Sequence, residues 1–242
     1  MLRPLAAVIA ASSALAGCHV QHDEGDGGPA ASRNYSVGNF QQIEVAGPYD
    51  VEVRTGANPS VAGRGSAKLL ERTIVEVQGD KLVIRPQNDH RVFHWGWTRH
   101  GKASFTVTVP QLSGATIAGS GDIRVDKISG PNFEGTVAGS GGLNVAAVNV
   151  QQLTLSIAGS GGVKAGAGTA QSAKYDIAGS GNIDAGAVQA QGLKVSIAGS
   201  GDVRAHSSGA ADVDMMGSGN VNVTGGAKCN VNKAGSGNVH CS

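Results

Sequence analysis

Apolar and polar residues alternate along most of the second half of the chain. Leu153, Leu155 and Ile157 occupy one set of positions, and Thr154 and Ser156 occupy the other. A period of two predicts a β-strand with one buried and one exposed face. Short glycine-containing breaks separate such runs, so we expect many short strands joined by turns.

The breaks recur at a nearly fixed interval. The tripeptide Gly-Ser-Gly begins at Gly119, Gly139, Gly159, Gly179, Gly199, Gly217 and Gly235. The spacings are 20, 20, 20, 20, 18 and 18 residues. Two apolar columns share this period: Ile117, Val137, Ile157, Ile177, Ile197 and, six residues later, Ile123, Leu143, Val163, Ile183, Val203. A repeat of this length indicates a solenoid, in which each unit covers the apolar face of the next.

Each unit is predicted to contain a strand, the Gly-Ser-Gly turn, a second strand and a looser turn. Stacking such units makes an all-β fold, a right-handed parallel β-helix over residues 111–242, because parallel crossovers are nearly always right-handed. With about 4.8 Å between stacked strands, six to seven coils form a rod roughly 30 Å long.

The repeated glycines have a structural explanation. A sharp corner at the same place in every coil needs backbone angles open mainly to glycine, and a side chain there would strike the neighbouring coil. The central serines would then form a ladder along one edge. No helix follows the glycines, so a dinucleotide-binding loop is excluded as their role.

Residues 37–110 lack the repeat but still alternate, as in FQQIEVA, YDVEVR and ASFTVTVP. In TIVEVQGDKLVIRP, Gly79-Asp80 separates two alternating runs, which predicts a hairpin. We expect an N-terminal β-rich region that leads into the first coil and caps its exposed edge, which would otherwise promote aggregation.

Three patterns together resemble a known family. They are F-x-x-I-x-V-x-G-x-Y-D-V-x-V from Phe40 to Val53, the V-x-G-D-K-L-V-I hairpin, and V-T-V-P-Q-L followed by I-A-G-S-G-D-I. This order resembles the putative auto-transporter adhesin, head GIN domain family, over roughly residues 37–242. The resemblance implies an adhesin-like role and supplies no established catalytic residues.

The first residues read as an export signal. Arg3 precedes the apolar run PLAAVIAASSALAG, which is too short to span a bilayer comfortably. Leu15, Ala16, Gly17 and Cys18 resemble a bacterial lipobox, so we expect residues 1–17 to be cleaved and Cys18 to be lipidated. The alternative is an ordinary signal peptide with a chance cysteine. Residues 18–36 are polar and predict a flexible tether. The expected partner is therefore a membrane, held through Cys18, and the expected location is the cell envelope, with the outer membrane favoured.

Composition and charge narrow the function. The chain has 38 glycines and only 4% aromatic residues, which suits thin regular units better than a thick layered core. Of 19 basic residues, only Arg3 lies in the expected signal, which leaves 18 basic against 18 acidic residues. This balance gives no indication of nucleic-acid binding.

Cys229 and Cys241 flank the last Gly-Ser-Gly unit. In an exported chain they predict a disulfide that locks the final coil, worth about 3 kcal/mol in the chain-entropy model. Two free thiols on columns that point apart are the alternative.

No catalytic cluster is visible in the repeat. Asp122 and Asp202 share a column but lie four coils apart, about 19 Å, whereas glycosidases need their two carboxylates within roughly 10 Å. The other acids, Asp126, Glu134, Asp176 and Asp184, look scattered and solvated.

Metal binding and cofactors are not expected either. The position after Gly-Ser-Gly holds only two carboxylates in seven units, so repeated calcium binding is improbable. The residues at this position are Asp122, Gly142, Gly162, Asn182, Asp202, Asn220 and Asn238.

One irregular segment, residues 88–102, contains both tryptophans and three histidines. Trp95 and Trp97 would share a face of a strand and offer a platform for a sugar. His90, His94 and His100 are candidate ligand contacts, with metal binding the weaker alternative. A purely structural hairpin that covers the end of the solenoid is the simplest interpretation.

These observations predict a non-enzymatic, lipid-anchored envelope protein that presents a β-helical surface to a glycan or protein ligand. A flat face of small outward residues would suit docking: Thr116, Ala118, Thr136, Ala138, Ser156, Ala158, Ser196, Ala198. The alternative is a carbohydrate-active enzyme with a groove between the entry region and the first coils. The sequence does not determine the oligomeric state.

Overall fold

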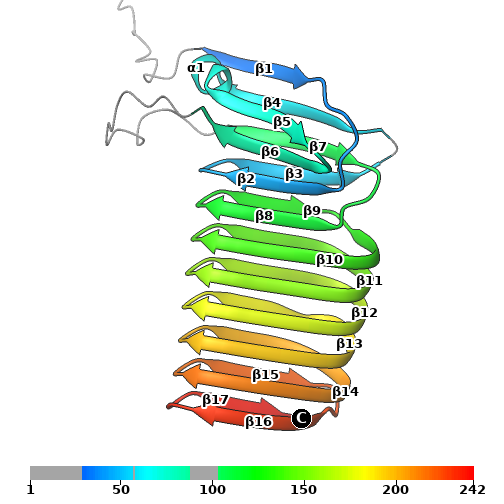
Figure 1. Cartoon of the computed structure of the whole chain (residues 1–242), viewed down its shortest axis with the longest axis vertical. Helices are drawn as coiled ribbons and strands as arrows, with labels where there is room; N and C mark the ends of the chain where they lie inside the picture. The colour runs from blue at the N-terminus through cyan, green and yellow to red at the C-terminus, as the bar shows by residue number, and fades with distance from the viewer. Residues whose placement is uncertain (1–28, 57, 88–102) are drawn as a thin grey trace, which may run out of the picture.

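A computed structural model describes residues 29–56, 58–87 and 103–242. These residues form one continuous stack of β-coils, drawn in Figure 1 with its long axis vertical. The expected parallel β-solenoid of roughly 20-residue coils is confirmed. Its repeat strands are β8 (Gly114–Gly119), β9 (Asp122–Val125), β10 (Ile128–Gly139), β11 (Gly142–Gly159), β12 (Gly162–Gly179), β13 (Asn182–Gly199), β14 (Asp202–Gly217), β15 (Asn220–Thr224), β16 (Lys228–Ala234) and β17 (Asn238–Cys241).

The register follows the sequence repeat. Leu143 pairs with Val163, and Ile157 pairs with Ile177, so identical places in successive units stack directly. The looser second turn that the sequence predicted in each coil is a bend within a continuous strand. β11, β12 and β13 each run for 18 residues from one Gly-Ser-Gly corner to the next, because parallel pairing continues on both sides of the bend.

The core is a set of columns that run the length of the rod. The two apolar columns identified from the sequence are buried throughout. Large and small side chains alternate where space requires it. Phe133 fills the room beside Gly135, where an added Cβ would meet Leu143 and Leu155 side chains. Tyr175 lies in the same column as Gly135, two coils farther along, and is buried. Desolvation raises the pKa of its hydroxyl above the ordinary value.

The corner glycines have the predicted structural role. The first glycine of each corner has a positive φ, for example 130° at Gly159. A Cβ on Gly159 would strike the carbonyl oxygen of Gly139 in the preceding coil. The backbone at this corner also pairs along the axis, because Ser160 and Gly161 both donate to the Gly139 carbonyl, at 2.9 and 3.0 Å. The central serines are exposed, as expected for a ladder along the edge.

The N-terminal region contributes two coils of its own as well as the cap. β2 (Gln42–Ala46) pairs in parallel with β8 on one side and with β6 (Lys81–Pro86) on the other. β3 (Asp50–Thr55) lies in the same way between β9 and β7 (Ser104–Val109). The coil β6–β7 therefore lies farther from the repeat than β2–β3, although it comes later in the chain.

Three strands and a helix close this end of the rod (Figure 1). They are β1 (Ala30–Tyr35), β4 (Ser60–Ser66), β5 (Thr73–Gln78) and α1 (Ala67–Glu71). β5 and β6 form the antiparallel hairpin predicted around Gly79, whose φ is 66°. The Ser66 hydroxyl caps α1 by accepting from the Leu69 N–H at 3.3 Å, and Leu70 is the buried residue of this helix.

Residues 30–35 differ from expectation. They were expected within the tether of residues 18–36, but they form β1, which pairs antiparallel with β4. The polar composition of this segment gave no sign of a strand, because most of its side chains are exposed. The strand is held by backbone pairing to β4 and by the partly buried side chains of Ala31 and Tyr35.

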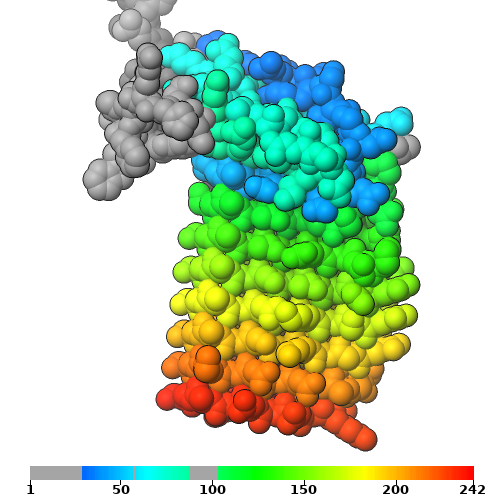
Figure 2. Space-filling view, in the orientation of Figure 1, coloured from blue at the N-terminus to red at the C-terminus, as the bar shows by residue number. Residues whose placement is uncertain are grey.

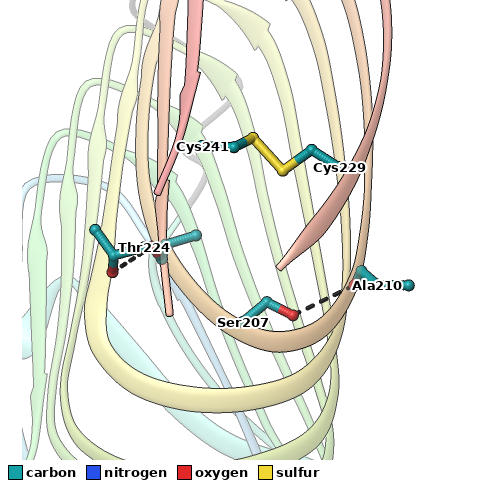
Figure 3. Close-up of a disulfide and its surroundings, with 6 residues drawn as sticks. Ser207, Ala210, Thr224, Cys229 and Cys241 are labelled. Carbon is teal, nitrogen blue, oxygen red and sulfur yellow. Dashed lines mark hydrogen bonds between the residues drawn. A yellow bond between two sulfur atoms is a disulfide. The ribbon is translucent and has the colours of Figure 1, made fainter. Parts of the chain in front are cut away.

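The opposite end is built from shorter coils. Between β13 and β14 the register jumps from the pair Ala185–Ala205 to the pair Gln189–His206, and then gains one residue after Ala190. This net loss of two residues accounts for the 18-residue spacing. Ser207 is fully buried at the bend, and its hydroxyl donates to the Ala210 carbonyl at 3.3 Å (Figure 3). The same hydroxyl donates to the Gln191 carbonyl at 3.4 Å.

The final coil is closed by a disulfide. The structure joins Cys229 of β16 to Cys241 of β17, the pair expected from the sequence, with the two Cα atoms 6.6 Å apart (Figure 3). The disulfide thus fastens β16 and β17 to one another across the interior of this coil.

Polar residues protect the same end. Among the described strands, β16 pairs only with β14 and β17 only with β15, and Val231, which follows Val213 in its column, is 44% exposed. Lys233 replaces the apolar residue in the column of Met215 and donates to the Gly237 carbonyl at 2.8 Å. An inward-facing charge on an edge strand disfavours edge-to-edge association.

Replacing Gly159 by alanine should lower the free energy of unfolding by about 3 kcal/mol, because it combines backbone strain with a backbone clash. The control is Gly162→Ala, where the nearest atom to the added Cβ lies at 3.9 Å. Urea unfolding followed by circular dichroism measures both variants. Equal stability of the two would contradict the structural role given to the corner.

Replacing Lys233 by methionine should make the chain associate through its C-terminal end. Lys228→Met is the matched control, because Lys228 lies on the same strand, carries the same charge and faces outward. Sedimentation velocity should detect larger species for Lys233→Met alone. A monomeric Lys233→Met variant would show that Lys233 does not protect this edge.

Candidate functional site

Of the site residues predicted from the sequence, Cys229 and Cys241 are described by the structure and form the disulfide. The others lie outside the described residues, as do residues 1–17: Cys18, His90, His94, Trp95, Trp97 and His100. The described residues on either side of segment 88–102 are held by backbone hydrogen bonds: the Gln87 N–H donates to the Arg72 carbonyl at 2.7 Å, and the Ala103 carbonyl accepts from the Asp50 N–H at 3.3 Å. The connection from β6 to β7 therefore begins and ends where other coils have their Gly-Ser-Gly corner.

The corner of the β2–β3 coil differs from the Gly-Ser-Gly corners of the repeat. Tyr49 stands where the repeat has its third corner glycine, and it is buried. Its ring packs edge-on against Phe105, with centroids 5.6 Å apart, and its hydroxyl accepts from Thr73 at 3.1 Å. Burial raises the pKa of Tyr49, so the phenol stays neutral. These contacts make the aromatic cluster part of the cap.

The acidic and amide column after each corner has a structural function. The Asp122 carboxylate accepts from the Gly142 N–H at 2.9 Å, and the Asn182 amide accepts from the Asp202 N–H at 3.1 Å. Asp202 in turn accepts from the Asn220 N–H at 2.9 Å. Each side chain thus satisfies a backbone donor in the next coil. Across the described ranges, no group of three His, Cys, Asp or Glu residues could hold a metal ion.

The register reveals one acidic pair that sequence reasoning missed. Asp50 pairs with Asp122, so these two residues lie on adjacent rungs, whose strands are about 5 Å apart. The sequence does contain a pattern that indicates this pairing, because AGPYD at 46–50 matches AGSGD at 118–122 at its first two and last residues. Arg124 lies 3.8 Å from the Asp122 carboxylate, so this pair is in a mixed-charge environment.

The outer face of β10 to β16 forms a groove that runs along the rod. One wall, the polar column, contains Thr136, Ser156, Asp176, Ser196, Asp214 and Asn232. The other wall, the methyl column, contains Ala158, Ala178, Ala198, Met216 and Ala234. The groove has a volume of about 600 Å³, within the range usual for ligand sites. Figure 2 shows how the stacked coils form continuous layers along this length.

This groove corrects the flat face expected from the sequence. Five of the small residues that the sequence placed on this outward face do line the groove: Thr136, Ser156, Ala158, Ser196 and Ala198. Two features were not recognised. Asp176, interpreted as an isolated solvated acid, lies in the polar column, and Met216 is 66% exposed at the groove's edge.

The charges of the groove are unevenly compensated. Lys174 binds the Asp176 carboxylate at 2.8 Å, and this hydrogen bond raises the pKa of Lys174. Asp214 is exposed, and no residue of the described ranges forms an ion pair or hydrogen bond with its carboxylate. The arrangement can therefore accept hydrogen bonds from a ligand whose other side is apolar.

A membrane-spanning helix is not part of this surface. None of the helical residues that the structure describes forms a segment long and apolar enough to cross a bilayer.

Solved structures share the fold over nearly the whole chain. A putative adhesin from Bacteroides fragilis is 23% identical, with a TM-score of 0.79, and the match covers 88% of this chain and 97% of that one. A putative lipid binding protein from Parabacteroides distasonis is 22% identical, with a TM-score of 0.68 and coverages of 90% and 98%. A putative adhesin from Parabacteroides merdae is 19% identical, with a TM-score of 0.67 and the same coverages.

None of the curated proteins compared with the chain matches it. The family described as putative auto-transporter adhesin, head GIN domain, matches residues 39–227, which include both the N-terminal coils and most of the repeat. The chain therefore belongs to this adhesin-like family.

Proposed function

We propose that the chain is a lipid-anchored envelope protein that binds a glycan or protein ligand on its solenoid surface without catalysing a reaction. The groove between the polar and methyl columns carries this proposal, because it offers hydrogen-bonding groups and apolar contacts at every coil. Membership of an adhesin-like family supports a non-enzymatic role at the cell surface or envelope. The names of the similar structures describe those proteins, two as putative adhesins and one as a putative lipid binding protein.

The rod geometry suits display. The N-terminal end of the rod, next to the proposed anchor, is closed by β1, β4, β5 and α1. The groove lies farther along, over β10 to β16, so a ligand approaching from the side would reach it without displacing the cap.

A carbohydrate-active enzyme is the second candidate. The pairing of Asp50 with Asp122 favours it, because it places two carboxylate residues on adjacent rungs, and retaining glycosidases use two carboxylates that lie close together. Against it, Asp122 already accepts the Gly142 N–H, which fixes its carboxylate in the backbone ladder. Release of reducing sugars from a polysaccharide panel, abolished by Asp50→Asn, would favour the enzyme over the binding protein.

Lipidation at Cys18 is tested by metabolic labelling with palmitate. The wild-type chain should carry the label and fractionate with membranes, because each buried methylene contributes about 0.8 kcal/mol to membrane association. Cys18→Ser should lose the label and leave the membrane fraction, whereas the neighbouring His19→Ala should retain both. Unlabelled wild-type protein would refute the anchor.

Ligand binding is tested by screening the chain against glycan and extracellular-matrix protein arrays. Trp95→Ala/Trp97→Ala separates the two interpretations of segment 88–102. Lost binding with unchanged thermal stability would assign the tryptophans to the ligand, and lower stability with retained binding would assign them to the fold. If the wild-type chain bound nothing on either array, the proposed binding function would fail.

A further inference from the structure

The groove is long, straight and different on its two sides. The polar column extends over six successive coils from Thr136 to Asn232, about 24 Å at the spacing of stacked strands. Every coil contributes one hydroxyl, carboxylate or amide to this wall, and the opposite wall is formed by methyl groups and Met216. A ligand that fills it must be linear, with a polar edge and an apolar face along its whole length.

Three kinds of linear ligand can be compared with these walls. An acyl chain would bury the polar column without hydrogen-bond partners, which is costly. An extended peptide returns a side chain to the same face about every 6.6 Å, out of phase with rungs about 4.8 Å apart. An extended β-linked sugar chain presents hydroxyls on its edges and C–H groups on its ring faces, and one ring advances by a distance close to one rung. The glycan therefore fits both walls.

The carboxylates indicate which glycan. Asp176 and Asp214 lie in the same column two rungs apart, with Ser196 between them. In an extended β-1,4-linked chain successive rings are flipped, so the same substituent returns to the same edge every second ring. An acetamido group supplies an N–H donor for each carboxylate, and its methyl group suits the apolar wall. A uronic acid chain, by contrast, would place like charges beside Asp214.

We infer that this groove binds a β-1,4-linked N-acetylhexosamine chain lengthwise, with acetamido N–H groups donating to Asp176 and Asp214. The inference rests on the proposed ligand-binding function and specifies its site and ligand class. No aromatic residue among those that the structure describes lines the groove, so each ring contributes little and affinity depends on the number of rings bound.

The test is isothermal titration of the purified chain with chitohexaose. Chitohexaose should bind about tenfold more tightly than cellohexaose, because the cellohexaose hydroxyl at the same ring position can also donate to the carboxylates but has no methyl group to pack against the methyl column. Chitobiose should bind more weakly than chitohexaose, and a polygalacturonate oligomer should not bind.

Matched variants locate the site. Ala198→Glu blocks the groove, and Asp214→Asn removes its uncompensated charge; each should weaken chitohexaose binding about tenfold. Ala187→Glu, an exposed alanine on the same strand, and Asp184→Asn, on the other layer of the coil, should leave binding unchanged. Circular dichroism confirms that each variant is folded.

Several results would overturn the inference. Equal binding of chitohexaose and cellohexaose would remove the role of the acetamido groups, and unchanged binding by Ala198→Glu would place the site elsewhere. Binding of a fatty acid or a peptide in the groove instead of chitohexaose would replace the ligand class. If array ligands bind but chitohexaose does not, only the inference fails; if nothing binds, the proposed function fails with it.

Discussion

Close backbone stacking at the glycine corner is the constraint on which this structure depends. At three successive corners a serine and the following glycine donate to one carbonyl of the preceding coil, as Ser180 and Gly181 do to Gly159 at 2.9 and 3.1 Å. A side chain at either glycine would separate the coils there. The corner therefore keeps every coil in the same register, and the apolar columns, the asparagine and aspartate contacts and the outer walls all follow from that register.

The same constraint explains the binding surface. Because equivalent residues stack directly, a residue type that recurs at one position of the repeat forms a continuous column along the rod. Thr136, Ser156 and Ser196 form such a column with Asp176 and Asp214, opposite the alanines and Met216. The solenoid thus offers a ligand many weak, evenly spaced contacts, a property better suited to binding a polymer than to assembling a compact catalytic centre.

The two ends of the rod solve the problem of exposed strand edges in different ways. At the N-terminal end, β4 and β1 extend the pairing antiparallel, and α1 with the Tyr49 and Phe105 rings covers the core. At the C-terminal end there is no such cover among the described residues. Shorter coils, the Cys229–Cys241 disulfide and inward-facing Lys233 are found there instead.

The sequence by itself determined the repeat, the alternation and the identity of the core columns, because a period of 20 residues is unambiguous and local. It also predicted the hairpin around Gly79 and the cysteine pair. Only the tertiary structure decided that β2–β3 lies between β6–β7 and β8–β9, that residues 30–35 form a strand, and that Asp50 lies beside Asp122. The groove was likewise recognised only in the structure, where Asp176, Ser196 and Asp214 stack in one column across the register shift at β14. The physical reason is the same in each case: periodicity specifies which residues face inward, whereas pairing between segments distant in the chain is chosen by backbone hydrogen bonds that leave no local pattern.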